Sequence, residues 1–215
     1  MKGRTQAVLL VNGVVLIVAG AVVMAVIVTI TNGRRKEDVC RTEHTHVFLQ
    51  GHNSLRYRLA RGQFEINGKR QPQAKNMRIL EWDCALAEAA QKWAEKCEWR
   101  HAGTDERERN TGENLYYYWT SERELNPYEG KAEKALQHWA GEFEKFDWKY
   151  DLLNWTRDYD TGHATQMIWD STHLLGCGMS HCEKQKLGVF VVCRYYPIGN
   201  YEGQYPYETI NATES

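Results

Sequence analysis

The chain has 215 residues, and its 27 Lys and Arg residues nearly balance its 28 Asp and Glu residues, for a formal net charge of −1. This length suits one ordinary domain with an appendage. Hydrophobic residues make up 42% of the chain and Pro only 4 positions, which excludes a disordered tail or a fibre. The balanced charge argues against nucleic-acid binding, because a protein that replaces phosphate counterions needs a basic face.

An apolar segment without charges covers residues 7–30, and two basic residues precede it. Its length of about 24 positions is enough to span a bilayer. We therefore predict that residues 1–33 form either a signal sequence for export or an uncleaved signal-anchor transmembrane helix. The length favours the anchor, whereas Thr31 and Gly33 suit a cleavage site, so both alternatives stay open.

All six cysteines follow this segment, and their number is even: Cys40, Cys84, Cys97, Cys177, Cys182 and Cys193. This arrangement indicates an oxidising compartment and a disulfide-bonded extracellular domain. Acceptor triplets for N-glycosylation at Asn154 and Asn211 agree with that location. A zinc-finger interpretation of the cysteines is weak, since no two of them have the Cys-x-x-Cys spacing.

The spacing of apolar residues predicts helices in the first half of the domain. A first helix is expected over 44–60, with Thr45 as its cap and Gly62 as its end. A second helix should begin near Asp83, whose carboxylate can cap free backbone N–H groups, and continue to Cys97.

The second half of the chain predicts one helix and one strand. In the helix, four apolar residues follow the spacing of three and four: Leu136, Trp139, Phe143 and Phe146. Residues 187–196 are rich in Val, Phe and Tyr and predict a buried strand that Pro197 ends. Helices and strands do not alternate regularly, which favours an α+β fold over a doubly wound sheet.

The common local catalytic signatures are absent from the sequence. There is no Gly-x-Ser-x-Gly elbow, phosphate-binding Gly-rich loop or His-Glu-x-x-His helix. What remains is a set of short polar islands at 97–101, 112–115, 139–142 and 162–169.

Several of these islands carry a resemblance to a known family. Five segments stand in the family's order: His52-Asn53-Ser54-Leu55-Arg56, Trp82-Asp83, Gly112-Glu113-Asn114, Gly162-His163 through Trp169, and Val192 through Asn200. They resemble the CAP superfamily, which contains the cysteine-rich secretory proteins, antigen five of insect venoms and plant pathogenesis-related proteins. The runs 163–167 and 176–178 are most similar to the venom-allergen-like secreted proteins of parasitic nematodes.

The resemblance implies an α+β fold, a disulfide-stabilised three-layer α-β-α sandwich with a central antiparallel sheet. The domain is expected over 47–203, after a polar linker at 34–46 and before a polar tail at 204–215. The implied disulfides are Cys97–Cys182, Cys177–Cys193 and, for the remaining two cysteines, Cys40–Cys84. Each is expected to stabilise the fold by about 2–4 kcal/mol.

The resemblance also implies a cleft with four functional residues: His101, Glu113, Glu142 and His163. Two imidazoles and one carboxylate, His101, His163 and Glu113, could hold a weakly bound zinc ion, leaving the second Glu to activate a water. The same four side chains could instead form a hydrogen-bonded network without a metal, which is the favoured interpretation. Ala164 replaces an aromatic residue found in many members, so more space is expected beside His163.

Two other features have a structural and a functional interpretation. His52 is expected to be an interior helix residue with a structural hydrogen bond. The aromatic run Tyr116, Tyr117, Tyr118 and Trp119 could line a groove for a sterol or fatty acid, although strand packing is the commoner role of such residues.

The favoured function is that of a secreted or membrane-anchored extracellular protein that binds without catalysis. Its partner would be a host or target molecule, or it would carry a sterol or fatty acid. If the apolar helix is not cleaved, it holds the protein in the membrane with the CAP domain outside. The alternative is a zinc-dependent hydrolase that uses the His and Glu residues of the cleft.

Overall fold

The computed structural model describes residues 10–11, 14–15, 40, 42–121, 124–146, 153, 159–183 and 188–210. The chain divides into two units, Met1–Val39 and Cys40–Ser215. In the first unit, strand β1 (Leu10–Val11) pairs antiparallel with β2 (Val14–Val15). These four residues belong to the predicted signal or anchor helix and are strand instead, while its other positions lie outside the described residues. Within the part of the chain that the structure describes, no helix is long and apolar enough to cross a membrane.

A four-stranded sheet forms the centre of the second unit, in the order β5-β7-β8-β6. The strands are β5 (Glu81–Trp82), β6 (Gly112–Tyr118), β7 (Leu174–His181) and β8 (Val189–Tyr196). β8 pairs antiparallel with both of its neighbours, whereas β5 runs parallel to β7. The sheet is therefore mixed, and the prediction of a purely antiparallel sheet was wrong at this edge. β5 leads directly into a helix, and the chain returns beside it only after a long crossover, which is the connection that parallel strands require.

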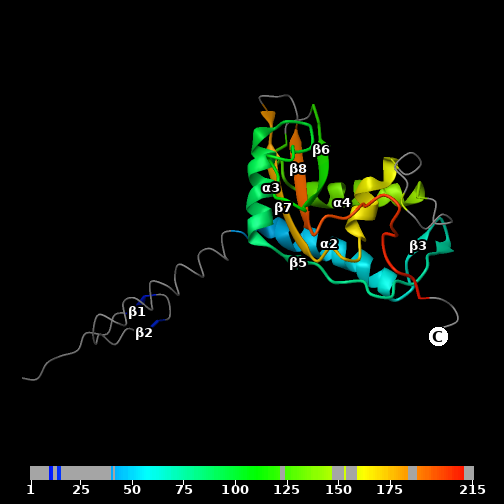
Figure 1. Cartoon of the computed structure of the whole chain (residues 1–215). Helices are drawn as coiled ribbons and strands as arrows, with labels where there is room; N and C mark the ends of the chain where they lie inside the picture. Colours follow the sequence, from blue (N-terminus) through cyan, green and yellow to red (C-terminus); the bar gives the residue numbers. More distant parts are fainter. Residues whose placement is uncertain are drawn as a thin grey trace, which may run out of the picture. The chain divides into compact units, whose positions relative to one another are not determined.

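Helices cover both faces of the sheet, so the predicted three-layer α-β-α arrangement is confirmed (Figure 1). Helix α3 (Cys84–Lys96) packs on one face, and α2 (Glu43–Ala60), α4 (Lys131–Gly141) and α6 (Gly162–Met167) lie on the other side. Short elements complete the fold: β3 (Glu65–Ile66), β4 (Lys69–Arg70), and the 3₁₀ turns η1 (Glu142–Glu144) and η3 (Tyr159–Thr161).

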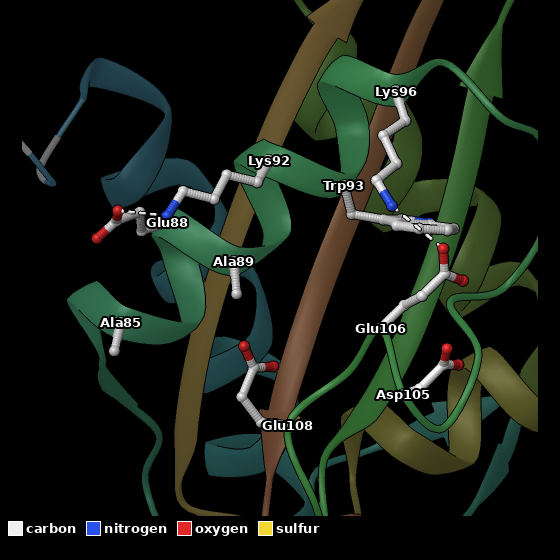
Figure 2. Close-up of a pocket in the computed structure, with 9 residues that line it drawn as sticks. All are labelled: Ala85, Glu88, Ala89, Lys92, Trp93, Lys96, Asp105, Glu106 and Glu108. Atoms are coloured by element: carbon white, nitrogen blue, oxygen red, sulfur yellow. Dashed lines mark hydrogen bonds and ion pairs between the residues drawn. The ribbon is translucent and has the colours of Figure 1, made fainter.

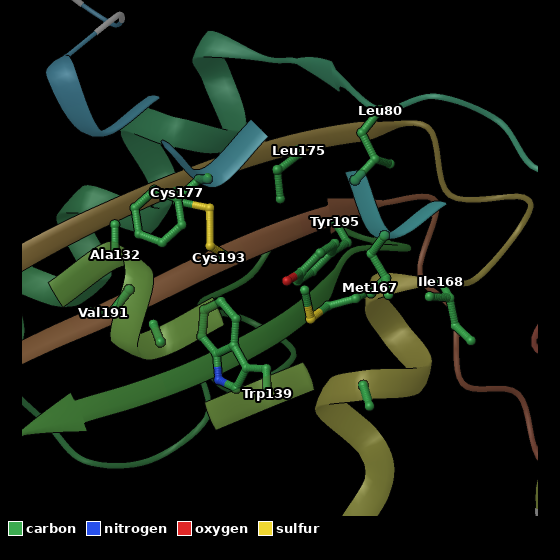
Figure 3. Close-up of a cluster of buried hydrophobic side chains, with 14 of the residues drawn as sticks. Leu80, Ala132, Trp139, Met167, Ile168, Leu175, Cys177, Val191, Cys193 and Tyr195 are labelled. Atoms are coloured by element: carbon green, nitrogen blue, oxygen red, sulfur yellow. A yellow bond between two sulfur atoms is a disulfide. The ribbon is translucent and has the colours of Figure 1, made fainter. Parts of the chain in front are cut away.

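The alternation of side chains along β8 divides the interior into two cores. One set packs among α2, α4 and α6, as Figure 3 shows in part: Val189, Val191, Cys193 and Tyr195. Phe190 and Val192 pack against α3 together with Trp93 and Leu115. Because β8 is buried on both faces, its sequence is apolar apart from Arg194, which is why it could be predicted as a buried strand.

The helix ends differ slightly from the predictions. α2 begins one residue early, and its N-cap is Thr42, with Thr45 at the third helical position. The Thr45 hydroxyl accepts a hydrogen bond from the Thr42 N–H at 3.0 Å, a reciprocal arrangement that two threonines three apart allow. Gly62 follows the helix with φ of +61°, as its predicted role as a stop requires. Asp83 caps α3 as predicted, since its carboxylate accepts from the Leu86 N–H at 2.8 Å.

The third predicted helix is shorter than its apolar spacing suggests. α4 ends at Gly141, and the chain tightens into the turn η1, which contains Glu142 and Phe143. Phe146 is buried in a separate small cluster with Leu153 and Trp169. The apolar stripe therefore continues through a change of helix type, which leaves Glu142 at the end of α4.

All three disulfides pair as the resemblance implies: Cys40–Cys84, Cys97–Cys182 and Cys177–Cys193. The first attaches the segment before α2 to the start of α3. After residue 203 the chain also packs on the domain, since Tyr207 is buried and the Lys75 N–H donates to the Glu208 carbonyl. Asn154 and Asn211, the predicted glycosylation sites, lie outside the described residues.

Close contact between α3 and β7 depends on glycine. A Cβ atom at Gly176 would meet the backbone of Leu86 and Ala87 in α3. We expect Gly176→Ala to lower the free energy of unfolding by about 3 kcal/mol, because the helix must move away from the sheet. Urea denaturation of the oxidised protein measures this change. Gly141→Ala is the control, since it has open space and a helical φ of −60°; equal effects of the two substitutions would contradict the explanation.

Candidate functional site

Four different elements supply the predicted tetrad of His101, Glu113, Glu142 and His163. His101 lies in the loop after α3, and Glu113 is the second residue of β6. Glu142 begins η1 directly after α4, and His163 is the second residue of α6. The structure brings them together as two His–Glu pairs, which we call the His101 pair and the His163 pair.

In the His101 pair, the carboxylate is buried and the imidazole is exposed. His101 Nδ1 lies 2.8 Å from Glu113 Oε1, and the side chains are 60% and 0% exposed. The same oxygen accepts a hydrogen bond from the Ala102 N–H at 3.0 Å. A carboxylate only accepts, so Nδ1 carries the hydrogen and Nε2 is left to meet a ligand.

In the His163 pair, the carboxylate binds the start of a helix as well as the imidazole. Glu142 Oε1 lies 2.6 Å from His163 Nδ1, and Oε2 accepts from the backbone N–H groups of His163 and Ala164. The imidazole stacks on the buried Trp139, with ring centroids 6.1 Å apart. The indole of Trp139 donates to the Leu115 carbonyl at 2.9 Å, which ties α4 to β6.

The two pairs are contacted by side chains on opposite faces of strand β6. Glu113 shares its face with Leu115, which packs in the α3 core. The next residue, Asn114, points to the opposite face, where its amide donates to the His163 carbonyl at 3.1 Å. Since β6 is an edge strand, the two pairs flank one edge of the sheet.

This geometry corrects the predicted zinc ligands. Glu113 lies behind His101, with its oxygens directed at His101, Ala102 and Arg194. Among the described residues, no three His, Cys, Asp or Glu side chains are grouped so that they could hold a metal ion. Each carboxylate instead lies within hydrogen-bond distance of one imidazole, and the predicted His-His-Glu ligand set is not grouped among the described residues.

Comparison with known proteins agrees with the fold. The model of the cysteine-rich secretory protein family, CAP, matches residues 49–195. This chain belongs to the CAP family. The predicted family is confirmed, and so is the likeness to nematode venom-allergen-like proteins.

Individual relatives span both secreted mammalian and venom proteins. Human cysteine-rich secretory protein 3 is 36% identical over 142 residues, which cover 64% of this chain and 54% of the relative. Venom allergen 5.01 of Dolichovespula maculata is 34% identical over 168 residues, covering 74% of this chain and 70% of the relative. The chain thus spans only about half the length of the human protein.

Among solved structures, the CAP domain is similar to NaASP2, whose crystal structure was determined with Zn²⁺. The TM-score is 0.70 at 31% identity, covering 80% of this chain and 89% of NaASP2. BmVAL-1 gives a TM-score of 0.69 at 29% identity, covering 80% and 85%.

The aromatic run of this CAP domain does not share one face. Tyr116 contacts the ring of His138 in α4 at 5.3 Å, and Tyr118 lies under the ammonium groups of Lys131 and Lys134. Tyr117 points the other way and meets Trp99, with ring centroids 4.7 Å apart. A single groove lined by the whole run is therefore not formed by these side chains.

Ala164 and His52 have structural positions. Ala164 is fully buried in the larger core, where its side chain packs; the additional space expected beside His163 stays a prediction. His52 is also fully buried, with Nδ1 2.8 Å from the Phe48 carbonyl and Nε2 2.8 Å from the Tyr195 hydroxyl. Burial lowers the pKa of His52 to about 4. The predicted structural role of His52 is confirmed.

A polar pocket of about 460 Å³ lies between α3 and the loop that follows His101 (Figure 2). An ionic network occupies one side of it, where Glu106 binds both Lys96 and Arg100. The Arg100 guanidinium is the main reason why the pKa of Glu106 lies well below its usual range. Lys92 pairs with Glu88 along the helix. These charges are largely paired with one another, so the pocket is a solvated ionic surface.

Sequence reasoning missed Arg194. This residue pairs with Glu113 across β6 and β8 and is 1% exposed. Burial lowers the pKa of its guanidinium, and the charge of Glu113 opposes that shift. The sequence did contain an indication of this buried ion pair, because a charged residue inside an apolar strand must have a buried partner.

Proposed function

We propose that this CAP domain is an extracellular binding protein that engages a target molecule through the surface around the two His–Glu pairs, without catalysing its conversion. The observation that carries the proposal is the engagement of both carboxylates. Glu113 has a fully buried side chain held by Arg194 and the Ala102 N–H, and Glu142 accepts from three donors of His163 and Ala164. A general base needs an oxygen within reach of a substrate or water, and these oxygens are directed at the protein.

A protein target suits the surface beside the His101 pair. Trp99 is 50% exposed and Tyr117 40% exposed, and the two rings meet edge to face. Tryptophan and tyrosine are enriched at protein interfaces, where one end of the ring is apolar and the other can hydrogen-bond. His101 follows Trp99 by two residues and is exposed as well.

Transport of a sterol or fatty acid is less well supported, because the aromatic run divides between the two faces of β6. We expect neither cholesterol nor palmitate to bind saturably. Titration of the full chain with each fluorescently labelled lipid measures this. Saturable binding that Tyr116→Ala weakens would assign the lipid-carrier role instead, and Tyr57→Ala, an exposed residue on α2, is the control.

A zinc-dependent hydrolase is the second candidate. Each imidazole has its Nδ1 on a carboxylate, which is the outer-shell arrangement of metal-binding histidines, and the related NaASP2 has a crystal structure with Zn²⁺. His101 and His163 would hold the ion through Nε2, and zinc would supply an activated water. Two protein ligands are consistent with weak zinc binding, whereas a catalytic zinc site has three protein ligands.

The experiment compares the wild-type chain with His101→Ala/His163→Ala. We expect the double variant to unfold as cooperatively as the wild type, because the side chains of His101 and His163 are 60% and 30% exposed. Calorimetric titration with zinc is expected to give weak saturable binding in the wild type and none in the variant. Hydrolysis of peptide and ester substrates, tested with and without zinc, is expected to be undetectable.

Zinc-dependent turnover with a bell-shaped pH profile, lost in the double variant, would overturn the non-catalytic proposal. A double variant without a cooperative transition would instead assign the tetrad to the scaffold of the fold.

For localisation, we propose export through the N-terminal apolar segment, with retention of that segment as a membrane anchor as the alternative. Mass spectrometry of the mature N-terminus distinguishes them.

A further inference from the structure

A buried arginine lies directly behind the His101 pair. Arg194 is on β8, where its neighbours Phe190 and Val192 pack in the α3 core. It stands opposite Glu113 in the register of β6 and β8. Its Nη2 lies 3.0 Å from Glu113 Oε2, and the two side chains are 1% and 0% exposed.

Stability alone does not account for this arginine. Among the described residues, nothing accepts a hydrogen bond from its Nε or Nη1. A buried ion pair must recover the loss of hydration of both charges, and apolar residues of similar size often serve a core equally well. A buried guanidinium with two unsatisfied donor atoms therefore stabilises the core less than an apolar side chain of similar size would.

The contacts of Glu113 lead from this arginine to the exposed surface. Oε2 faces Arg194, while Oε1 receives the Ala102 N–H and lies 2.8 Å from His101 Nδ1. Oε1 therefore has two hydrogen-bond partners, whereas Oε2 is held by the buried ion pair with Arg194 and not by a hydrogen bond, so rotation of the carboxylate would separate two buried charges. His101 is 60% exposed, so little else restrains its ring.

We propose that Arg194 is a positioning residue of the site: through Glu113, it fixes the tautomer and orientation of His101, so that Nε2 faces the ligand. The proposal rests on the proposed function, in which the surface around the tetrad binds the target. Arg194 touches no ligand itself.

The arginine also makes the two halves of the site electrically different. The Arg194 charge balances Glu113, so the His101 pair with its arginine is neutral when the imidazole is neutral. Glu142 is held by backbone N–H groups, and among the described residues its only ion-pair partner is His163. When its imidazole is neutral, the His163 pair therefore carries a negative charge, which attracts a ligand cation.

The test uses Arg194→Met in the full chain, with two readouts. We expect the ¹⁵N shifts of the His101 imidazole, measured at fixed pH, to move from a single Nδ1–H tautomer toward a mixture. With the zinc ion as probe, calorimetry should show a roughly tenfold loss of affinity, as expected for an outer-shell residue. Arg194→Lys should recover part of both signals, because the ammonium keeps the charge but not the guanidinium fork.

Lys131→Met is the matched control, since Lys131 is also a buried cation in an ion pair, with Glu124. It should change neither readout. Should Arg194→Met fail to fold, Arg194→Gln supplies a neutral polar replacement. A folded neutral variant with wild-type His101 shifts would overturn the proposal. If wild-type protein does not bind zinc, only the metal candidate fails, because the tautomer measurement still decides the role of Arg194.

Discussion

Arg56→Met is expected to lower the free energy of unfolding by about 4–5 kcal/mol. Arg56 is fully buried in α2 and donates to five backbone carbonyl groups: those of Arg78, Met167, Trp169, Asp170 and Thr172. Methionine fills similar space but leaves these acceptors without their donor. Burial lowers the pKa of Arg56 to about 9, so the guanidinium remains charged at neutral pH.

Denaturation in guanidinium chloride, with the disulfides intact, measures the effect. The matched control is Arg58→Met, two residues along the same helix, where the exposed guanidinium lies 5.1 Å from the centroid of the Phe64 ring. Its loss should cost less than about 1 kcal/mol. A change below 1 kcal/mol for Arg56→Met as well would show that water or rearranged backbone replaces the donors.

Acidification is expected to destabilise the protein through His52. The pKa of this residue is lowered from 6.5 to about 4, mainly by burial and despite its bond to the Phe48 carbonyl. Between these two values the unfolded chain takes up a proton that the folded chain does not, so stability falls as pH falls from 6.5 to 4. The difference corresponds to about 3 kcal/mol.

The comparison with His52→Gln isolates this contribution. The free energy of unfolding should differ between wild type and variant at pH 7.5, and the difference should shrink by about 3 kcal/mol at pH 4. His46→Gln, which changes an exposed imidazole on the same helix, gives the reference slope. A constant difference between wild type and His52→Gln across this range would show that His52 takes up its proton equally in both states.

The sequence was sufficient where a local pattern carries the information. Asp83 caps α3 because a carboxylate before an apolar helical stripe has free N–H groups within reach. β8 was predictable because a strand buried on both faces is mostly apolar, and Arg194 is the one charged residue of this strand. β7 was not predicted, since Gly176 and Gly178 interrupt its apolar pattern so that α3 can approach.

The tetrad was predictable only through the family resemblance. Glu113 and Glu142 are 29 positions apart along the chain, and no local spacing predicts that each will meet a histidine. The resemblance supplied the four residues, but it did not supply their pairing. Two adjacent residues of β6, Glu113 and Asn114, point to opposite faces and so distribute the site between two layers.

By itself, the sequence predicted the family, the disulfide-bonded extracellular character, the main helices and the four candidate site residues. The tertiary structure alone decided that the carboxylates lie behind the imidazoles, that β5 runs parallel to β7, and that Arg194 stands behind Glu113. The physical reason is that caps and apolar periodicity are interactions within a few residues. Strand register and buried charge pairing join positions far apart in the chain, such as Glu113 and Arg194, and exist only once the sheet has formed.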